Sequence, residues 1–214
     1  MSKNTIVRVV LFTTLLLGLS TAFTGRASAE ENIWTGIGPT IPYSGYISAL
    51  AVDPVTPGTL YAARGEVYKS IDGGASWLAA GSGLPADPSG VFSLAIDPTL
   101  PSTVYAGTAG GVYKSMAGGA SWLAANNGLG ITDGYGYIYA MAIDPFAPNI
   151  LYVGLGDVVY KSADGGENWQ QVSVDLPVSA YVYSLVIDPK MPATLYAGTY
   201  GSVYKSIDSG AHWT

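Results

Sequence analysis

Carboxylates are the residues of this chain best suited to acid–base chemistry: it has 15 Asp and Glu residues but a single histidine and no cysteine. Hydrolysis of a glycosidic bond needs two such acids on opposite sides of a cleft. Seven of the carboxylates recur in two kinds of turn. Among the other eight, Asp133 and Asp157, both in predicted loops, are the candidate catalytic acids. No spacing singles them out, and acids exposed in surface loops are the simpler interpretation.

The residue types that other catalytic sites need are scarce. His212 is the only histidine and cysteine is absent, which excludes zinc sites of the usual composition and Cys–His nucleophilic pairs. Arg64 is the one arginine beyond residue 29. A single arginine cannot form the cluster that binds a substrate carboxylate. We therefore expect neither a metal nor a cofactor.

Tyrosines form the second group with chemical potential. Tyr46, Tyr135, Tyr137 and Tyr181 lie in predicted loops or at the starts of the following strands, and Asp133 is close to two of them in sequence. A tyrosine ring offers a flat apolar surface with a polar tip, which suits sugars and protein partners. Loops on a rigid scaffold are common binding sites. We expect these residues to bind a glycan or a protein; the alternative is that some rings fill a central channel.

The elements that would position these residues are repeated four times. The pattern Ser-x-Asp-x-Gly-x-x-Trp, which we call the box, occupies residues 70–77, 115–122, 162–169 and 206–213, with Ala117 in place of Asp in the second copy. Asp-Pro recurs at Asp53, Asp97, Asp144 and Asp188, at spacings of 44, 47 and 44 residues. A period of 40–50 residues with several short strands per unit is typical of propeller blades.

Each repeat divides into four strands joined by Gly, Pro or Asp turns, as in an antiparallel meander. In the first repeat we predict strands at 46–52, 59–63, 66–70 and 76–80. The blades are expected at about 46–90, 91–136, 137–181 and 182–214, the last stopping just inside its fourth strand. Residues 34–40 resemble an extra fourth strand. The fold class is therefore all-β, with about four propeller blades. They form either part of a larger propeller, which we favour, or a four-bladed ring.

The repeated pattern resembles the Asp-box, or bacterial neuraminidase repeat, and its copies cover nearly all of the chain beyond residue 29. That family includes sialidases, xyloglucanase-type glycoside hydrolases, sortilin-type receptors, a photosystem II assembly factor and many secreted bacterial proteins. The resemblance implies that each box is a structural hairpin between the third and fourth strands of a blade, away from the face used for chemistry. A sialidase site needs several arginines, and this stretch has only Arg64.

The box residues suit roles in the fold. Asp can accept bonds from nearby N–H groups, Gly suits a positive φ, and Trp buries a large ring. The residues predicted to act in this way are Ser70, Asp72, Gly74, Trp77, Ser115, Gly119, Trp122, Ser162, Asp164, Gly166, Trp169, Ser206, Asp208, Gly210 and Trp213. A Tyr-Lys pair precedes every box. Strand alternation predicts that each Tyr packs inward and each Lys lies in solvent.

The first 29 residues have the pattern of a secretory signal peptide. Lys3 and Arg8 precede an apolar run at 9–23, and Ala27-Ser28-Ala29 is a small-x-small cleavage sequence. An uncleaved anchor is the alternative. Residues 30–214 would form the propeller, secreted, periplasmic or on the cell surface, without a stable membrane span after cleavage. They keep 15 acidic but only six basic residues, which disfavours nucleic acid.

The sequence thus predicts an exported, non-enzymatic β-propeller module that presents a tyrosine-rich loop face to a glycan or protein. One alternative is a segment of a xyloglucanase-like glycoside hydrolase, whose catalytic acids would be shared with further blades. Another is a protein similar to the photosystem assembly factor. The oligomeric state is left open.

The predicted signal peptide gives a direct test. N-terminal sequencing of the exported protein should begin at Glu30, because cleavage follows Ala29 in the small-x-small pattern. Recovery of the protein from the cytoplasm with Met1 intact would contradict this prediction.

Overall fold

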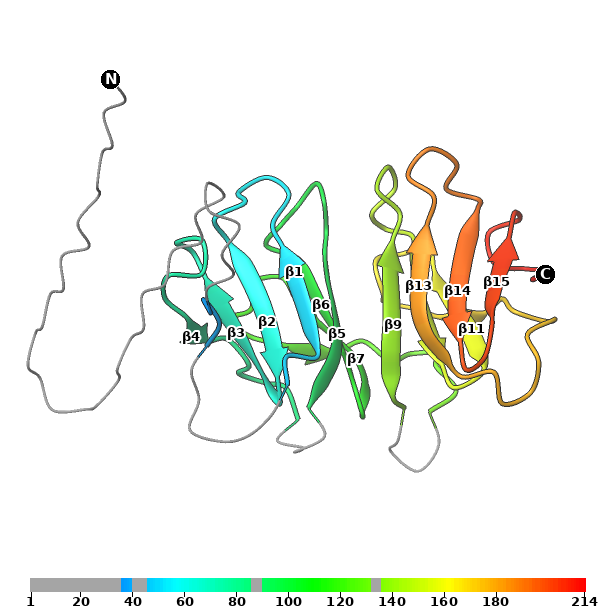
Figure 1. Cartoon of the computed structure of the whole chain (residues 1–214), viewed down its shortest axis with the longest axis horizontal. Helices are drawn as coiled ribbons and strands as arrows, with labels where there is room; N and C mark the ends of the chain where they lie inside the picture. The colour runs from blue at the N-terminus through cyan, green and yellow to red at the C-terminus, as the bar shows by residue number, and fades with distance from the viewer. Residues whose placement is uncertain (1–35, 40–45, 86–89, 132–135) are drawn as a thin grey trace, which may run out of the picture.

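The computed structural model describes residues 36–39, 46–85, 90–131 and 136–214, and every regular element in them is a β-strand (Figure 1). The strands form four antiparallel sheets in chain order. The first sheet has β1 (Ala49–Val52), β2 (Leu60–Arg64), β3 (Glu66–Ser70) and β4 (Leu78–Ala79). The second has β5 (Val91–Ile96), β6 (Val104–Thr108), β7 (Gly111–Ser115) and β8 (Leu123–Ala124). The third has β9 (Ile138–Ile143), β10 (Leu151–Leu155), β11 (Val158–Ser162) and β12 (Gln170–Gln171), and the fourth has β13 (Val182–Ile187), β14 (Leu195–Thr199) and β15 (Val203–Ser206).

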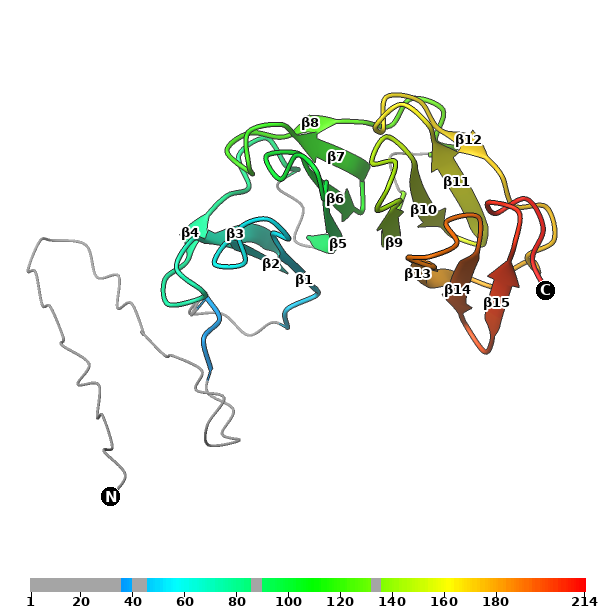
Figure 2. The same cartoon turned by 90° about the horizontal axis from the view of Figure 1, so that it is seen from above.

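Each sheet is one blade of a propeller, and the four blades follow one another along an open arc (Figure 2). The first strands β1, β5, β9 and β13 lie side by side on the concave side of the arc, and β4, β8 and β12 lie on its outer side. One end of every blade carries the box and the Asp-Pro turn. The opposite end, which we call the loop end, carries the hairpin between the second and third strands. No helix in the described residues is long and apolar enough to cross a membrane.

The Asp-Pro turns have the predicted geometry. Asp53 Oδ1 accepts the N–H groups of Val55 and Thr56 at 2.8 and 2.9 Å, and Asp97, Asp144 and Asp188 each accept the two corresponding N–H groups. The turn also holds its box, since the Gly73 N–H donates to the Gly58 carbonyl at 2.9 Å. Side-chain capping of this kind fixes a turn through contacts within the turn itself.

The core lies between blades. Tyr61, Val67 and Ala63 of the first blade pack with Val104, Ala106 and Trp122 of the second, and two further clusters join blades two to three and three to four. Tyr61, Tyr105 and Tyr152, at equivalent positions, are each only 1% exposed. A single blade therefore has no closed core of its own, and it becomes stable by stacking on its neighbours.

A tyrosine of the second strand and the lysine of the Tyr-Lys pair bind together across these interfaces. The Tyr61 hydroxyl and Lys69 Nζ both donate to the carbonyl of Gly118, in the box of the second blade, at 3.0 Å. Tyr105 and Lys114 bind the Gly165 carbonyl of the third blade in the same way, at 2.9 and 2.8 Å. Each lysine also lies over the ring of its own blade's tyrosine. The prediction that these lysines lie free in solvent is wrong, because a half-buried carbonyl of the next blade is within their reach.

Tryptophan makes a second link between blades. The indole N–H of Trp122 donates to the Ala80 carbonyl, and that of Trp169 to the Ala125 carbonyl, each at the end of the preceding blade's fourth strand. In the first blade the Trp77 indole donates to Ile37. Ile37 therefore occupies the position that a preceding fourth strand takes in the later blades.

The fourth blade has three assigned strands, in the order β13-β14-β15. Thr214 nevertheless exchanges both backbone hydrogen bonds with Lys205, at 2.9 and 2.8 Å. Leu78 of β4 pairs with Lys69 in the same register. Thr214 thus occupies the first position of a fourth strand.

Candidate functional site

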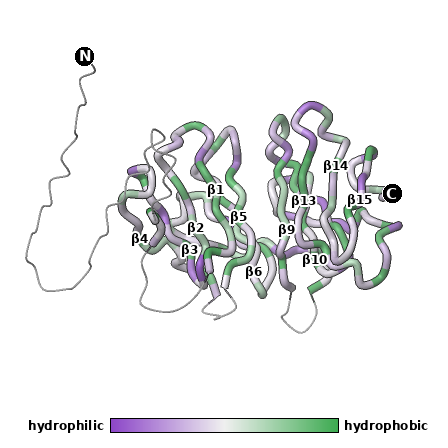
Figure 3. Tube along the Cα trace, in the orientation of Figure 1, coloured by the Kyte–Doolittle hydropathy of each residue, from purple (hydrophilic) through white to green (hydrophobic). Residues whose placement is uncertain are grey.

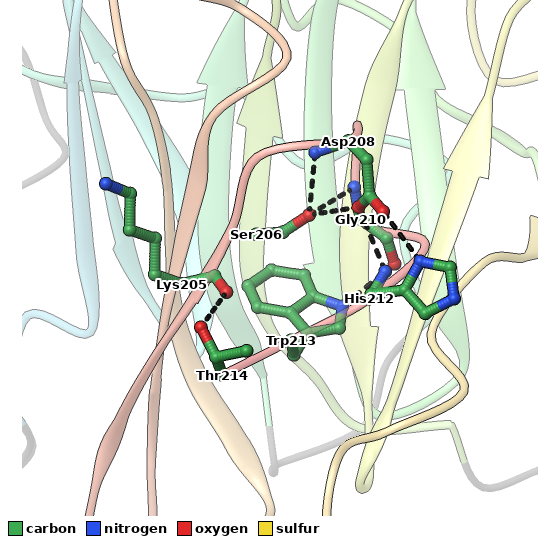
Figure 4. Close-up of polar contacts among 7 residues, drawn as sticks. All are labelled: Lys205, Ser206, Asp208, Gly210, His212, Trp213 and Thr214. Carbon is green, nitrogen blue, oxygen red and sulfur yellow. Dashed lines mark hydrogen bonds and ion pairs between the residues drawn. The ribbon is translucent and has the colours of Figure 1, made fainter.

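The boxes are self-contained hairpins. Ser70 Oγ accepts the Gly74 N–H at 2.9 Å and donates to Asp72 Oδ1 at 2.7 Å. The Asp72 carboxylate in turn accepts the Ser76 N–H at 2.8 Å and the Ser76 hydroxyl at 2.6 Å. The same contacts recur around Asp164 and Asp208, and Figure 4 shows the fourth copy, from Ser206 to Trp213.

The hydrogen bonds stabilise the charged form of each box carboxylate. The Ser76 hydroxyl and N–H lower the pKa of Asp72 to about 2, and the Asn168 side chain and N–H lower the pKa of Asp164 to about 2. Asp208 has a lowered pKa, chiefly from the His212 N–H, and its carboxylate raises the pKa of His212. These carboxylates stay ionised and bound within their hairpins at neutral pH, which suits structural groups rather than general acids.

The second box shows which contacts survive without the carboxylate. Ser115 Oγ still accepts the N–H groups of Ala117 and Gly119, at 3.2 and 2.9 Å. Gly118 between them accepts the Tyr61 and Lys69 donors of the preceding blade. The serine therefore forms the turn, and the aspartate adds a second set of bonds to it.

A different group of residues gathers on the concave side of the arc. Phe92 of β5, Tyr139 of β9 and Tyr183 of β13, with Tyr137 just before β9, form a continuous set of ring contacts, which we call the aromatic row. The ring centroids are 4.8 Å apart for Phe92 and Tyr139, 5.7 Å for Phe92 and Tyr137, and 5.5 Å for Tyr139 and Tyr183. Tyr137 and Tyr139 stack with their planes 9° apart and their centroids at 5.9 Å.

The aromatic row is partly open to solvent. Tyr137 is 38% exposed and Tyr183 is 49% exposed, while Tyr139 between them is half-buried. Burial raises the pKa of the Tyr139 phenol, with smaller contributions from Tyr137, Tyr183 and Tyr46. Tyr46 is thus within electrostatic range of the row, and its own ring is 78% exposed. Figure 3 shows that the concave strands are rich in hydrophobic residues.

Among the predicted binding residues, Tyr46, Tyr137 and Tyr181 occupy one repeated position, seven residues before the Asp-Pro aspartate. The structure brings Tyr137 into the aromatic row and Tyr46 near it. Tyr181 is 51% exposed, and no ring contact joins it to the row within the described residues. The predicted residues Asp133 and Tyr135 lie outside the described residues.

Asp157 lies in a different place. It lies in the hairpin between β10 and β11, and its carboxylate accepts the N–H of Ser179, which lies between β12 and β13, at 2.8 Å. It lines a hollow of about 330 Å³ together with Gln171, Val174, Val178 and three neighbours. This aspartate supports a loop of its own blade, and no second acid lines the hollow. In the described parts of the chain, no cluster of three or more His, Cys, Asp or Glu residues could hold a metal ion.

Sequence reasoning missed Phe92, Tyr139 and Tyr183. All three lie five residues before the Asp-Pro aspartate of their blade, a position occupied by Ser48 in the first blade. In a strand, residues two apart point to the same side, so Tyr137 and Tyr139 belong to one face. The fixed offset from the Asp-Pro turn was the signal that could have found this row.

No protein-family model matches the chain, and no curated protein matches it. Among solved structures, the chain resembles an ancestral GH74 enzyme with 28% sequence identity and a TM-score of 0.69, over 82% of this chain and 25% of that one. It also resembles the GH74 xyloglucanase of Xanthomonas campestris, with 20% identity and a TM-score of 0.62, over 77% of this chain and 29% of that one.

A third similar structure is an auxiliary nutrient binding protein of Bacteroides thetaiotaomicron, with 13% identity and a TM-score of 0.57, over 74% of this chain and 37% of that one. The chain thus spans between about a quarter and two fifths of the length of these three proteins. The predicted all-β propeller fold is confirmed by the four antiparallel sheets and by these neighbours.

The contribution of the aspartate to the stability of the box can be tested by mutation. Asp72→Ala removes the bonds to Ser76 and should lower the free energy of unfolding by about 1 kcal/mol, as the loss of a capping side chain does. Ala117→Asp should be neutral or stabilising, because it supplies the carboxylate that the second box lacks. Urea unfolding would measure the free energy of unfolding of both variants, provided that its dependence on urea concentration has the same slope as in the wild type. An Asp72→Ala protein as stable as the wild type would contradict the role of the carboxylate.

Proposed function

We propose that this protein is an exported β-propeller module that binds a glycan through the aromatic row on its concave face. The observation that carries the proposal is the set of four rings from three consecutive blades, with Tyr137 and Tyr183 substantially exposed. Rings from separate blades form an extended surface rather than one small pocket, which suits a chain of sugar units.

The chemistry of this surface favours a neutral, hydroxyl-rich ligand. The rings supply apolar area, and their phenolic hydroxyls lie at the edges and can donate or accept hydrogen bonds. Charged residues are only 11% of the chain, and Arg64 is the one arginine beyond residue 29, so an acidic ligand would find few partners. A protein partner that inserts polar side chains is the alternative occupant of the same surface.

The glycan proposal agrees with what two similar structures are called, a xyloglucanase and a nutrient binding protein. Their identities of 20% and 13% support the fold alone, so the ligand class rests on the aromatic row. Export rests on the signal-peptide pattern of residues 1–29, which lie outside the described residues.

A glycoside hydrolase segment is the second candidate, favoured by the 28% identity to an ancestral GH74 enzyme. It requires two acids across a cleft. Asp157 is engaged by the Ser179 N–H, and Asp133 lies outside the described residues. Release of reducing sugar from xyloglucan by the wild-type chain, abolished by Asp133→Asn, would establish this alternative. The third candidate, a protein similar to a photosystem assembly factor, has repeat-level resemblance as its only support.

Removal of one exposed ring tests the binding proposal. Tyr137→Ala should weaken binding of a xyloglucan or β-glucan oligosaccharide by a factor of roughly 5 to 150, the usual effect of losing an aromatic contact at a site centre. Isothermal titration calorimetry would measure the dissociation constant, and thermal unfolding would report stability in parallel.

Phe146→Ala is the matched control, because Phe146 is 73% exposed but lies in an Asp-Pro turn at the box end. It should leave the dissociation constant unchanged. The proposal fails if Tyr137→Ala binds the oligosaccharide normally, and a large loss of stability with normal binding would identify Tyr137 as a packing residue of the channel.

A further inference from the structure

Large apolar side chains are exposed at the end of the blades that carries the boxes and the Asp-Pro turns, which we call the box end. The arrows of β9 and β13 point to this end in Figure 1. In the second blade, Leu100 of the Asp-Pro turn is 57% exposed and Met116 of the box is 69% exposed. In the third blade, Phe146 of the Asp-Pro turn is 73% exposed. Both of these blades have a neighbouring blade on each side, so stacking between blades leaves the three side chains in solvent.

The same places in the other blades also hold apolar residues. The position after the box serine and the third or fourth position of the Asp-Pro turn are more than half exposed in the first and fourth blades, where they hold Ile71, Ile207, Val55 and Met191. Single exposed apolar residues are ordinary on a protein surface. A set of them gathered at one end of a molecule is typical of an interaction site.

The fold does not need apolar side chains at these positions. The Leu100 N–H donates to Asp97 Oδ1 at 2.9 Å, and its turn is held through this backbone group. The Phe146 N–H donates to Asp144 Oδ1 at 2.8 Å in the same way. Met116 directly follows the buried box serine. None of the three side chains belongs to the apolar clusters that join the blades, so their apolar character has no role in the core.

The second box is uncharged, and the boxes beside it are acidic. Ala117 stands where the other boxes have Asp, so Met116 and Ala117 together form an exposed apolar tip. Asp72 of the preceding blade and Asp164 of the following blade are exposed, and their hydrogen bonds lower the pKa of each to about 2. Glu167, also exposed, adds another carboxylate in the third box. An apolar centre therefore lies between blades that carry ionised carboxylates.

The basic groups closest to this centre are engaged within the fold. Lys69 and Lys114 are half-buried, and their ammonium groups bind the carbonyls of Gly118 and Gly165 at 3.0 and 2.8 Å. Among the described residues, the boxes, the Asp-Pro turns and the lysines before the boxes contribute eight carboxylates, five lysines and one histidine to this end. The net charge of the box end is therefore negative.

We propose that the box end of the second and third blades docks a protein segment that presents apolar side chains between lysines or arginines. Its apolar side chains pack on Leu100, Met116 and Phe146, which we call the box-end patch. Its basic side chains pair with the carboxylates of the neighbouring boxes, as complementary charges do at the rim of an interface.

Charge disfavours the other possible occupants of the box-end patch. Residues 30–214 have 15 acidic and only six basic residues, so an anionic lipid surface and a second copy of the chain would both be repelled. The patch is also separate from the aromatic row. The row lies near the starts of β5, β9 and β13, whereas the patch lies beyond the opposite ends of the first strands. Binding at the patch is therefore independent of glycan binding.

The test uses a fluorescently labelled synthetic peptide of alternating leucine and lysine, titrated with the whole chain and followed by anisotropy. Binding should be saturable and should weaken as salt is added, because salt screens the charge pairs. Met116→Ser and Leu100→Ser should each weaken binding at least about 5-fold, because each removes a buried apolar contact. Glu167→Gln should weaken it by a factor of roughly 2 to 5, the usual effect of losing one exposed ion pair.

Val178→Ser is the matched control, because Val178 is 89% exposed but lies beside Asp157, away from the boxes. It should leave the affinity unchanged. A peptide with serine in place of leucine should bind at least about 5-fold more weakly, and one with glutamate in place of lysine should not bind. All four substituted side chains are exposed, so thermal unfolding of each variant should match that of the wild type.

Three results would overturn the proposal: no binding of the leucine–lysine peptide, equal binding of the serine peptide, or normal binding by both Met116→Ser and Leu100→Ser. Two further measurements examine the other occupants. Cosedimentation with anionic phospholipid vesicles, or a dimeric mass in light scattering, that is lost in Met116→Ser would assign the patch to a membrane or to a second copy and would also overturn the proposal.

Discussion

The structure depends on one contact, repeated at the first two interfaces, in which a tyrosine hydroxyl and a lysine ammonium from one blade bind a single carbonyl in the box of the next. The carbonyl belongs to a glycine in a tight turn, where the backbone turns its oxygen toward the preceding blade. The serine of the box holds that turn by accepting the N–H of the following glycine. The box therefore contributes to the protein as an acceptor for its neighbour, and its charged aspartate stabilises the hairpin that presents the acceptor.

This arrangement also explains where a ligand could bind. The flat faces of the blades are used in stacking, and the concave side is among the surfaces left over. On the concave side the first strands of successive blades contact one another. Residues at one repeat position, such as Phe92, Tyr139 and Tyr183, consequently gather although they are far apart in sequence.

The sequence was sufficient to predict local structure, because the Asp-Pro turns and boxes are held by side chains within a few residues. It predicted the strand at 66–70 as observed and placed the fourth strand at 76–80, where only Leu78–Ala79 is assigned. The lysine contacts and the aromatic row could not be derived from periodicity alone, since both depend on which blade lies beside which. Alternation assigns a lysine to one face of its sheet but does not show what covers that face.

A double-mutant cycle on one interface tests the central contact most directly. Tyr105→Phe and Lys114→Met each remove one donor to the Gly165 carbonyl, and we predict that their effects on the free energy of unfolding are non-additive by at least about 0.5 kcal/mol. Tyr105→Phe combined with Lys69→Met, which affects a different interface, should be additive. Additive effects for Tyr105 and Lys114 would contradict the account, because the two side chains would then act independently of a shared acceptor.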